Sequence, residues 1–342
     1  MKNKTVSLKH IAEHLNISVT TVSFVLNGKA KEKHISEILT QKVLDYAKKV
    51  NYKPNQLAQS LRTGKSKILV FMVEDISNYF FAKLARIIED IAYEKGYKVI
   101  FCSNENDDTK SLDLIGLFKN RQVDGFIIVP SPGMKDMIAE LIEENHPVIL
   151  LDRYFADLEC NSVVIDDQKA TFEATSHLIS NNYKKIAFIT TDSDQMQVQN
   201  RLLGYKNAIA ANKLESHILK IPYKDAKNGK AKNSIKNYLT SEDLDAVFFA
   251  TNYLTQSGLE TFKENNLEST HNLGMVAFGD NELFKIYSPT ITAVSQPLEA
   301  ICQSLMELML MLLKQKNVKG ISKKIVLNAE LKVRESSKKR LL

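Results

Sequence analysis

The sequence contains no tryptophan and only three cysteines among its 342 residues. Cys102, Cys160 and Cys302 lie far apart without the spacing of a metal site, so we expect buried thiols, no bound metal and a reduced cytoplasmic compartment. The first ten residues, MKNKTVSLKH, lack the apolar run of a signal peptide. The longest apolar stretches, such as 68–73 and 305–313, are too short to span a bilayer. These absences predict a cytoplasmic protein with no membrane partner.

The motifs of common cofactor-dependent and hydrolytic enzymes are also missing. No GxGxxG or GxSxG motif occurs. Gly64-Lys65-Ser66 resembles the end of a Walker loop, but the first glycine of that motif is replaced by Gln59. The seven histidines are scattered, which favours structural roles. We therefore expect a protein that is not an enzyme and holds no cofactor. A chain of this length, 44% hydrophobic and 25% charged, predicts two or three globular domains.

Positive charge is concentrated in the first fifth of the chain. Residues 1–65 hold 12 Lys+Arg against 4 Asp+Glu, a net charge of +8, whereas the whole chain carries +6. Clustered positive charge binds phosphate through counterion release, without sequence information. The candidate phosphate-binding lysines are Lys2, Lys4, Lys9, Lys29, Lys31, Lys33, Lys42 and Lys53. For any one of them, a solvated surface charge is the simpler alternative.

The segment SLKHIAEHLNISVTTVSFVLN has the pattern of a helix-turn-helix. Leu8, Ile11, Ala12 and Leu15 recur at i, i+3, i+4 and i+7, which is one apolar face of a first helix. Ser18 suits the N-cap of a second helix. That helix directs Val22, Val25 and Leu26 inward and leaves Val19, Thr20, Thr21, Ser23 and Phe24 outward. A short polar outer face suits insertion into the DNA major groove, although an ordinary helical hairpin shares the same periodicity.

A lysine-rich loop, 27–36, and a third helix, roughly 38–51, complete the predicted domain. We expect Val43, Leu44, Ala47 and Val50 to point inward. The proline in Tyr52-Lys53-Pro54-Asn55 ends the helix. The following segment, 56–62, is too short to be a stable helix alone, so we expect it to fold only against DNA and a dimer partner. Its apolar face of Leu57, Ala58 and Leu61 resembles a minor-groove wedge, and a plain linker is the alternative.

From Lys67 onward, apolar strands alternate with helices. The predicted strands are 67–73, 97–103, 125–131, 147–152, 162–166, 185–191, 217–223, 246–252 and 274–279. The helical segments include 80–94, 108–120, 169–181, 201–212 and 255–265, and the tail adds a helix (298–316) and an extended stretch (323–334). This alternation predicts parallel sheets covered on both faces. Nine or ten strands exceed one sheet, so we expect two doubly wound subdomains with a ligand cleft between them.

These motifs together resemble the LacI/GalR family of bacterial transcriptional regulators along essentially the whole chain. The resemblance rests on IAEHLNISVTTVSFVLN, NYKPNQLAQSLRTG, VEDISNYFF, RQVDGFIIVPS, VILLDR and the end of TAVSQP. It implies a helix-turn-helix domain (1–53), a hinge helix (54–65) and a core similar to periplasmic sugar-binding proteins (66–337). We expect the core to divide into an N-subdomain, 67–165 plus 297–322, and a C-subdomain, 166–293 plus 323–336. The family further implies a homodimer on a pseudo-palindromic operator, controlled by a small effector.

The resemblance also implies the DNA-contacting residues. They are Ser18, Val19, Thr20, Thr21, Ser23, Phe24, Asn27, Lys9, His34, Tyr52, Asn55, Gln59 and the lever Leu61. Phe24 departs from the family, which usually has an arginine there to donate to guanine, so we expect no strong guanine preference at that base. The loop before the third helix is about three residues longer than is common. The end ESSKKRLL lacks leucine heptads, which favours a dimer over a tetramer.

The implied effector contacts follow strand ends. They are Asp75, Asn78, Phe80, Phe81, Ser131, Asp152, Arg153, Asp166, Asp167, Thr191, Ser193, Gln197, Arg201, Asn252, Asp280 and Gln296. Bidentate polar groups beside an aromatic platform suit a sugar. Gly279 replaces the aspartate that many relatives direct at a sugar hydroxyl, and Asp280 is displaced by one. Arg153 and Arg201 together favour a carboxylate clamp, so the effector hypotheses are a sugar, a sugar acid and a sugar phosphate.

We therefore predict a regulator of carbohydrate-metabolism genes, a repressor by family frequency. The effector acts through its different affinities for two closure states of the cleft. A sugar-binding protein without gene control and a regulator that responds to a purine are the alternatives.

Overall fold

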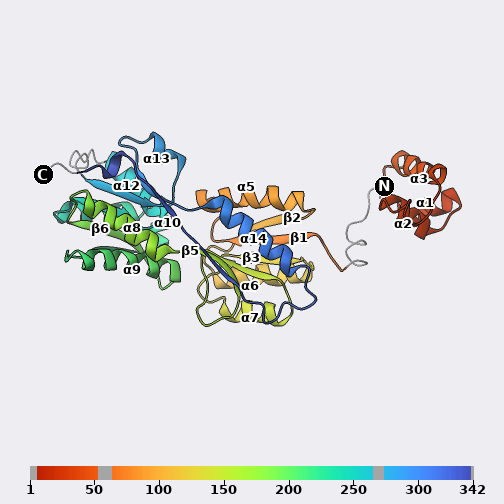
Figure 1. The fold of residues 1–342 in the computed structure, drawn as a ribbon, viewed down its shortest axis with the longest axis horizontal. Helices are drawn as coiled ribbons and strands as arrows, with labels where there is room; N and C mark the ends of the chain where they lie inside the picture. The colour runs from red at the N-terminus through yellow and green to blue at the C-terminus, as the bar shows by residue number, and fades with distance from the viewer. Residues whose placement is uncertain (1–5, 53–63, 265–272, 340–342) are drawn as a thin grey trace. The chain divides into compact units, whose positions relative to one another are not determined.

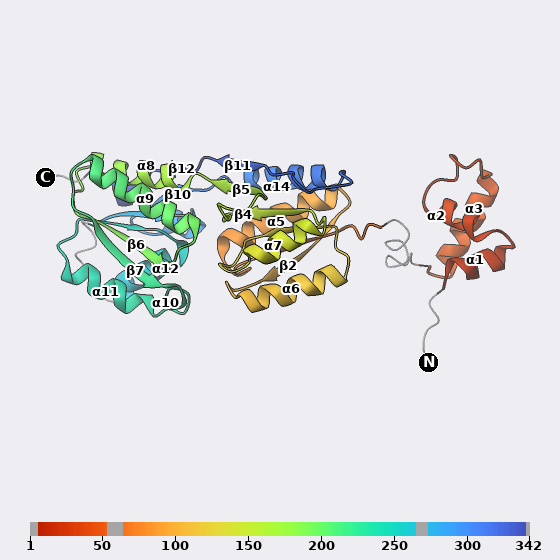
Figure 2. The ribbon, with the colours of Figure 1, turned by 90° about the horizontal axis from the view of Figure 1, so that it is seen from below.

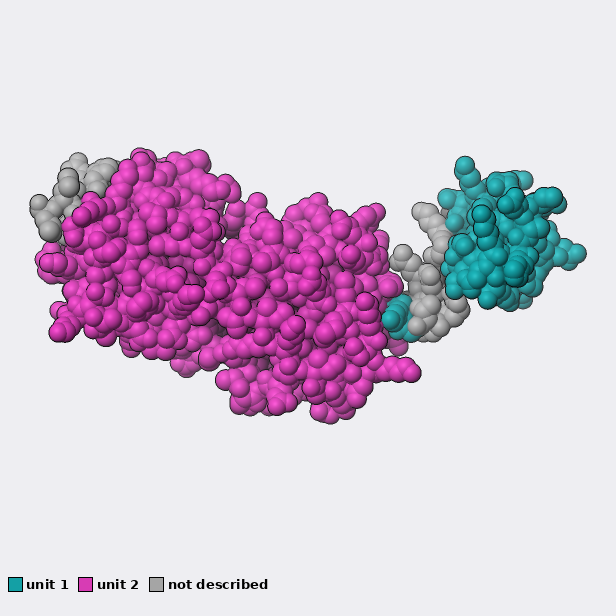
Figure 3. Space-filling model, viewed as in Figure 1, with its two compact units in different colours: residues 1–66 teal, residues 67–342 magenta. Residues whose placement is uncertain are grey.

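The computed structural model describes residues 6–52, 64–264 and 273–339. The chain forms two compact units, Met1–Ser66 and Lys67–Leu342, which are coloured separately in Figure 3. The predicted hinge contacts Asn55, Gln59 and Leu61 lie outside the described residues, as do Lys2, Lys4 and Lys53. Within the described ranges, no helix combines the length and apolar character needed to cross a membrane.

The first unit contains three helices, α1 (Leu8–Leu15), α2 (Val19–Leu26) and α3 (Glu37–Lys49). Each begins after a serine, Ser7, Ser18 or Ser36, whose side chain accepts a hydrogen bond from a backbone N–H in the first turn. Such caps satisfy donors that the helix itself leaves unpaired. Asn16 ends α1 in the left-handed conformation, which asparagine tolerates better than most residues. The tight turn between α1 and α2 is therefore encoded locally.

The core of this unit is small. Ile11, Val22 and Val43 are fully buried and come from the three different helices. The prediction for α3 is correct for Val43 and Ala47, and Val50 packs against the same cluster. It is wrong for Leu44, which is 41% exposed. The inward face of α3 follows the four-residue step from Val43 to Ala47, so the residue one position later turns away from the core.

The second unit contains two six-stranded sheets. The first has the order β11-β5-β4-β3-β1-β2, with all neighbours parallel. Its strands are β1 (Ile68–Val73), β2 (Lys98–Ser103), β3 (Gly125–Ile128), β4 (Val148–Leu151), β5 (Asn161–Ile165) and β11 (Lys324–Leu327). Its helices are α5 (Tyr79–Glu94), α6 (Asp108–Asn120), α7 (Lys135–Glu143) and α14 (Leu298–Leu312).

Alternate residues of β1 pack on opposite faces of this sheet. Leu69 and Phe71 belong to the cluster under α5 and α14, which lie side by side in Figures 1 and 2. Val70 and Met72 belong to the cluster under α6 and α7. Burial on both faces explains why the strand is a continuous apolar run.

The second sheet has the order β12-β10-β9-β8-β6-β7, in which β12 is antiparallel to β10. Its strands are β6 (Ile186–Asp192), β7 (His217–Pro222), β8 (Ala246–Phe249), β9 (Gly274–Phe278), β10 (Thr292–Ser295) and β12 (Glu330–Lys332). Its helices are α8 (Asp167–Ser180), α9 (Met196–Ala211), α10 (Tyr223–Lys227), α11 (Ala231–Ser241), α12 (Asn252–Glu264) and α13 (Glu282–Ile286), and the short 3-10 helix η2 (Glu335–Ser337) follows β12.

Three details differ from the prediction. The described residues contain twelve strands instead of nine or ten, since β10 and the two tail strands complete the sheets. The stretch 323–336 was assigned to the C-subdomain, but β11 pairs with β5 in the first sheet and only β12 reaches the second. The second sheet also carries one antiparallel edge strand. As a result, the chain passes between the sheets near 165–167, 295–298 and 327–330.

Candidate DNA interface and ligand cleft

Helix α2 presents a small, polar outer face. The Ser18 side chain accepts a hydrogen bond from the backbone N–H of Thr21 at 3.0 Å, and its Oγ lies 2.8 Å from Thr21 Oγ1. Val19 and Thr20 are exposed, and Ser23 is half-buried. Side chains of this size at the N-terminal end of a helix allow the backbone to approach base edges closely.

Phe24 lies on α2 together with a cation from the following loop. Lys33 Nζ lies 5.5 Å from the centroid of the half-buried Phe24 ring, within the range of a cation–π interaction. The longer loop is fixed by backbone hydrogen bonds, among them Ile35 N–H to the Ala30 carbonyl at 2.9 Å. A phenyl ring offers no hydrogen bond to guanine, but it places a lysine beside the outer face of α2.

The other described DNA candidates differ in exposure. Lys9 and His34 are exposed, and His34 has a left-handed backbone. The Asn27 amide already donates to the Ser23 carbonyl at 2.6 Å, so it ends the helix. Tyr52 is half-buried against the three-helix core, and burial raises the pKa of its hydroxyl. Lys9 and His34 can therefore reach a ligand without rearrangement, whereas Asn27 and Tyr52 first support the fold.

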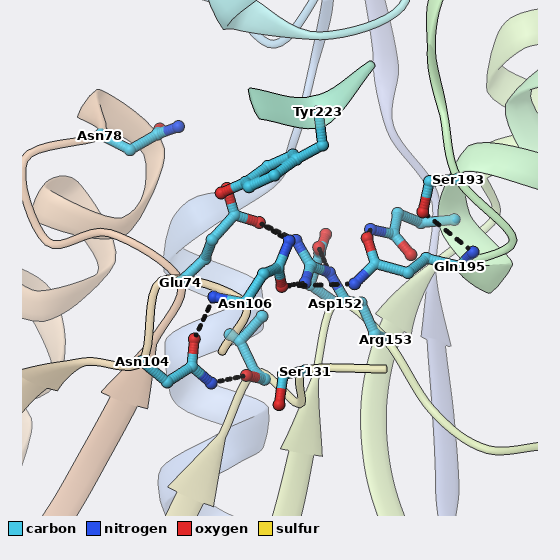
Figure 4. Close-up of polar contacts among 12 residues, drawn as sticks. Glu74, Asn78, Asn104, Asn106, Ser131, Asp152, Arg153, Ser193, Gln195 and Tyr223 are labelled. Atoms are coloured by element: carbon cyan, nitrogen blue, oxygen red, sulfur yellow. Dashed lines mark hydrogen bonds and ion pairs between the residues drawn. The ribbon is translucent and has the colours of Figure 1, made fainter. Parts of the chain in front are cut away.

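A cavity of about 120 Å³ lies where loops of both sheets converge. The predicted effector residues that line it are Asn78, Phe80, Phe81, Asp152, Arg153, Thr191, Gln197, Arg201, Asn252, Asp280 and Gln296. They follow β1, β4, β6, β8, β9 and β10, as expected for ligands bound beyond the carboxyl ends of parallel strands. Figure 4 shows part of this site.

Five predicted residues do not line the cavity, and one of them, Asp167, is the buried ion-pair partner of Arg201 behind it. Asp75 accepts hydrogen bonds from the backbone N–H and hydroxyl of Ser77, so it shapes the turn before α5. Asp166 caps α8 by accepting from the backbone N–H of Lys169. Ser131 and Ser193 line a second, neighbouring cavity. Asp280 does line the first cavity, but both of its oxygens accept hydrogen bonds from Arg334, at 2.9 and 2.8 Å.

Several lining side chains are absent from the predicted set. Glu74 directly follows β1, one position before the predicted Asp75, and is buried. Tyr223 directly follows β7, and Tyr253 is next to the predicted Asn252. Position at a strand end was therefore the right signal, but it does not decide which of two adjacent residues faces the cavity. Phe278 looks like an ordinary core residue of β9 in the sequence.

Arg153 is held by the protein itself. Its guanidinium forms a buried ion pair with Glu74, donates to Asn106 Oδ1 at 2.5 Å and to the Pro130 carbonyl at 3.3 Å (Figure 4). Arg201 is held in the same way. Its Nε donates to Asp167 Oδ1 at 2.7 Å, its Nη1 donates to the Ala250 carbonyl, and its guanidinium lies 3.7 Å from the centroid of Phe278.

These pairings contradict the predicted carboxylate clamp. Three carboxyl groups, Glu74, Asp152 and Asp167, face the guanidinium groups of Arg153 and Arg201, so the cluster has no excess of positive charge. Burial raises the pKa of Asp167 to about 7, against the opposing effect of Arg201, and burial also raises the pKa of Asp152. Asp152 and Asp167 are therefore the carboxyl groups at which this cluster accepts a proton.

Three buried polar atoms of the cavity wall have no hydrogen-bond partner among the described residues. They are Arg153 Nε, Gln197 Oε1 and the Tyr253 hydroxyl. Buried polar groups are nearly always paired, because an unmade hydrogen bond is costly. A ligand that carries several hydroxyl groups can supply the missing partners when these lining side chains turn toward the cavity.

Direct hydrogen bonds also close the cleft between the subdomains. The side-chain amides of Asn78 and Asn252 exchange hydrogen bonds at 2.7 and 3.3 Å. The Tyr223 hydroxyl donates to Glu74 Oε1 at 2.7 Å. In each pair, one residue follows a strand of the first sheet and the other follows a strand of the second. These hydrogen bonds in the cavity wall therefore hold the two subdomains in their present relative position.

A helix-turn-helix unit joined in one chain to a two-sheet core with a ligand cleft defines a ligand-controlled DNA-binding protein. Two family descriptions match. "Bacterial regulatory proteins, lacI family" matches residues 7–55, and "Periplasmic binding proteins and sugar binding domain of LacI family" matches residues 65–322. The chain belongs to the LacI family of bacterial regulators, and it is a DNA-binding transcriptional regulator. Its family regulates transcription and is not a family of enzymes.

Individual relatives agree with this assignment. The chain is 32% identical over 336 residues to the HTH-type transcriptional regulator RegA of Clostridium saccharobutylicum, covering 97% of this chain and 99% of that protein. It is 31% identical over 306 residues to the sucrose operon repressor of Lactococcus lactis subsp. lactis, covering 89% and 92%. The lac repressor dimer bound to operator and the anti-inducer ONPF has the same fold, with a TM-score of 0.84, 21% identity and coverage of 98% and 100%.

Proposed function

We propose that this regulator represses carbohydrate-metabolism genes and that its effector is a small, neutral, polyhydroxylated molecule bound in the cleft. The observation that carries the proposal is the wall of the cavity, where the arginines are paired internally and three buried polar atoms have no hydrogen-bond partner in the part of the chain that the structure describes. The similarity to the sucrose operon repressor of Lactococcus lactis supports control by carbohydrate. As a DNA-binding regulator, the protein is expected to act in the cytoplasm as a homodimer on a pseudo-palindromic operator.

Charge selects against an anionic effector. A sugar acid or phosphate would compete with Glu74 for Arg153 or with Asp167 for Arg201, and displacement of either carboxylate leaves it buried without its partner. Removing one partner of a buried pair costs roughly 3–5 kcal/mol. A neutral sugar avoids this cost, because its hydroxyl groups can both donate to and accept from paired ions. Of the three effector hypotheses, the neutral sugar is therefore the one that we retain.

Aromatic rings supply the remaining recognition. Tyr79, Phe80 and Tyr223 line the cavity together with Phe278, whose ring is covered by Arg201. Rings that line a polar cavity bind the C–H face of a sugar while the polar groups read its hydroxyls. The purine alternative would use the same rings by stacking, so purines are included in the thermal-shift screen.

Control of DNA binding follows from the closure of the cleft. The Asn78–Asn252 and Glu74–Tyr223 contacts hold one closure state without a ligand. An effector that binds the cavity replaces or reinforces such contacts and so changes the population of that state. Within the described residues, the chain passes between the sheets three times, and these passages must bend when the cleft opens or closes. The effector changes DNA affinity by as much as its affinities for the two closure states differ.

A thermal-shift screen tests the effector class. Neutral pentoses and hexoses, uronic and aldonic acids, sugar phosphates and purines are added in turn to the purified protein. We expect one or more neutral sugars to raise the Tm of the core unit by about 5 °C at a hundredfold excess over Kd. A response confined to the acids, phosphates or purines would contradict the proposal.

Gln197→Met provides the matched variant for that screen. It keeps the size of the side chain but removes the unpartnered Oε1, so the Tm shift by the sugar should disappear while the ligand-free Tm is preserved. Gln256→Met, at an exposed position of α12, should leave the shift unchanged.

A further inference from the structure

A second cavity, of about 450 Å³, adjoins the first. Its lining comes from loops after β3 and β4 in the first sheet and from the segment between β6 and α9 in the second. The lining residues are Pro130, Ser131, Pro132, Arg153, Tyr154, Phe155, Ala156, Asp157, Ser193, Asp194, Gln195 and Met196. We call this space the outer cavity and the cavity of about 120 Å³ the inner cavity.

Arg153 and Gln195 line both cavities, so together they form the partition between them. Asn106 joins the two halves of the partition, because its Oδ1 accepts from Arg153 Nη1 at 2.5 Å and from Gln195 Nε2 at 3.3 Å. Figure 4 shows this chain of contacts, which crosses from one subdomain to the other. The side chains of Arg153, Asn106 and Gln195 therefore form the partition between the inner and the outer cavity.

The two halves of the partition differ in how firmly they are held. Arg153 is fixed by its ion pair with Glu74 as well as by Asn106 and the Pro130 carbonyl. Among the described residues, the Gln195 side chain has two long hydrogen bonds, 3.3 Å to Asn106 Oδ1 and 3.5 Å to Gln197 Nε2. Hydrogen bonds of that length are weak. Gln195 is therefore the more weakly held half of the partition.

We propose that the inner and outer cavities are two subsites of one effector site, and that the effector is a neutral glycoside with one sugar ring in the inner cavity and a second unit in the outer one. The glycosidic linkage passes beside Arg153 at the position of the Gln195 side chain. This proposal rests on the proposed function, because it assigns a carbohydrate to the inner cavity.

The chemistry of the outer cavity fits a neutral unit with one apolar face. Phe155, Met196 and the two prolines provide apolar walls, and Lys324 Nζ already covers the Tyr154 ring at 3.7 Å. Asp157 pairs with Lys135, and Arg153 pairs with Glu74. The remaining charged residue of the lining, Asp194, is acidic, so an anionic unit is repelled. A second sugar ring and an aromatic aglycone both meet these conditions.

Isothermal titration calorimetry on the full-length protein tests the two subsites. Each monosaccharide that raises the Tm is compared with its methyl glycoside, its disaccharides and its 4-nitrophenyl glycoside. We expect at least one two-unit ligand to bind about tenfold or more tightly than its monosaccharide. A disaccharide advantage identifies a second sugar as the outer unit, and an advantage of the nitrophenyl glycoside alone identifies an aromatic aglycone.

Two variants locate the added affinity. Phe155→Ala removes an apolar wall of the outer cavity only, and Ala156→Trp fills that cavity from an exposed position. Either variant should remove the advantage of the two-unit ligand and leave the Kd of the monosaccharide unchanged. Phe172→Ala, at an exposed phenylalanine of α8 that lines neither cavity, is the matched control and should change neither constant.

The outcomes distinguish this proposal from the one on which it rests. Equal affinity for monosaccharides and glycosides, or a two-unit advantage that survives Ala156→Trp, would overturn the two subsites and leave the carbohydrate effector intact. If no saccharide of either length binds, then the carbohydrate effector and the two subsites are both wrong.

Discussion

Replacing Ile11 with alanine should weaken DNA binding and destabilise the DNA-binding unit while leaving the ligand-binding core intact. Ile11 is fully buried at the centre of the three-helix cluster, with Val22 and Val43 as its buried partners from the other helices. An Ile→Ala change in a packed core costs roughly 2–5 kcal/mol. A unit of this size has roughly 3–7 kcal/mol of stability in total. The substitution therefore removes most of the stability of the DNA-binding unit.

Fluorescence anisotropy with a labelled duplex measures this effect. We expect the affinity for DNA to fall by up to about thirtyfold, because a loss of about 5 kcal/mol from a stability of about 3 kcal/mol leaves the unit mostly unfolded. The Tm of the core unit should remain unchanged in calorimetry, because residues 67–342 form a separate compact unit. Ile38→Ala is the matched control, since Ile38 is 74% exposed on α3. If Ile38→Ala weakened DNA binding as much as Ile11→Ala, the three-helix packing would be wrong.

Arg201→Ala should destabilise the core unit and remove the response to the effector. Arg201 is buried with Asp167, donates to the Ala250 carbonyl and lies against Phe278. Loss of the guanidinium leaves Asp167 buried without a counter-ion, at a cost of roughly 3–5 kcal/mol. Denaturant titration of the core transition measures this loss, and the thermal-shift assay measures the response.

Two further variants make the interpretation of Arg201→Ala specific. Arg86→Ala removes an arginine that also has two carboxylate partners, Glu89 and Asp90, but on the exposed surface of α5. Exposed pairs are worth about 0–1 kcal/mol, so its effect should be small. Arg201→Lys keeps the charge and tests binding if the alanine variant does not fold. A sugar response of wild-type size in Arg201→Lys would show that the bidentate geometry of Arg201 is not needed.

The helices and strands of this chain were largely predictable because their signals are local. The serines at positions 7, 18 and 36 start α1, α2 and α3 at the residues that a capping rule indicates. Strands such as β1 are continuous apolar runs because helices cover both faces of the sheet. The tail was harder, since β11 and β12 are adjacent in sequence but pair with different sheets, and no local signal encodes that choice.

The cleft was predictable in position but not in chemistry. Strand ends indicated where Asp152, Arg153 and Arg201 would lie, and all three line the inner cavity. The sequence could not show that Glu74 and Asp167 neutralise the two arginines, because the partners are far apart in the chain. Arg153 and Glu74 are 79 positions apart, and Arg201 and Asp167 are 34 positions apart. The carboxylate clamp was therefore a reasonable prediction from two arginines, and the pairing of each arginine with a carboxylate argues against it.

The central claim is that a neutral sugar in the cleft controls DNA binding, and a DNA titration with and without that sugar tests it most directly. The operator is obtained by selection from random duplexes, and its Kd is measured by anisotropy for the wild type and Gln197→Met. We predict that saturating sugar changes the Kd of the wild type by at least about fivefold, and that Gln197→Met shows no change. An operator affinity that is the same with and without saturating sugar would contradict the claim.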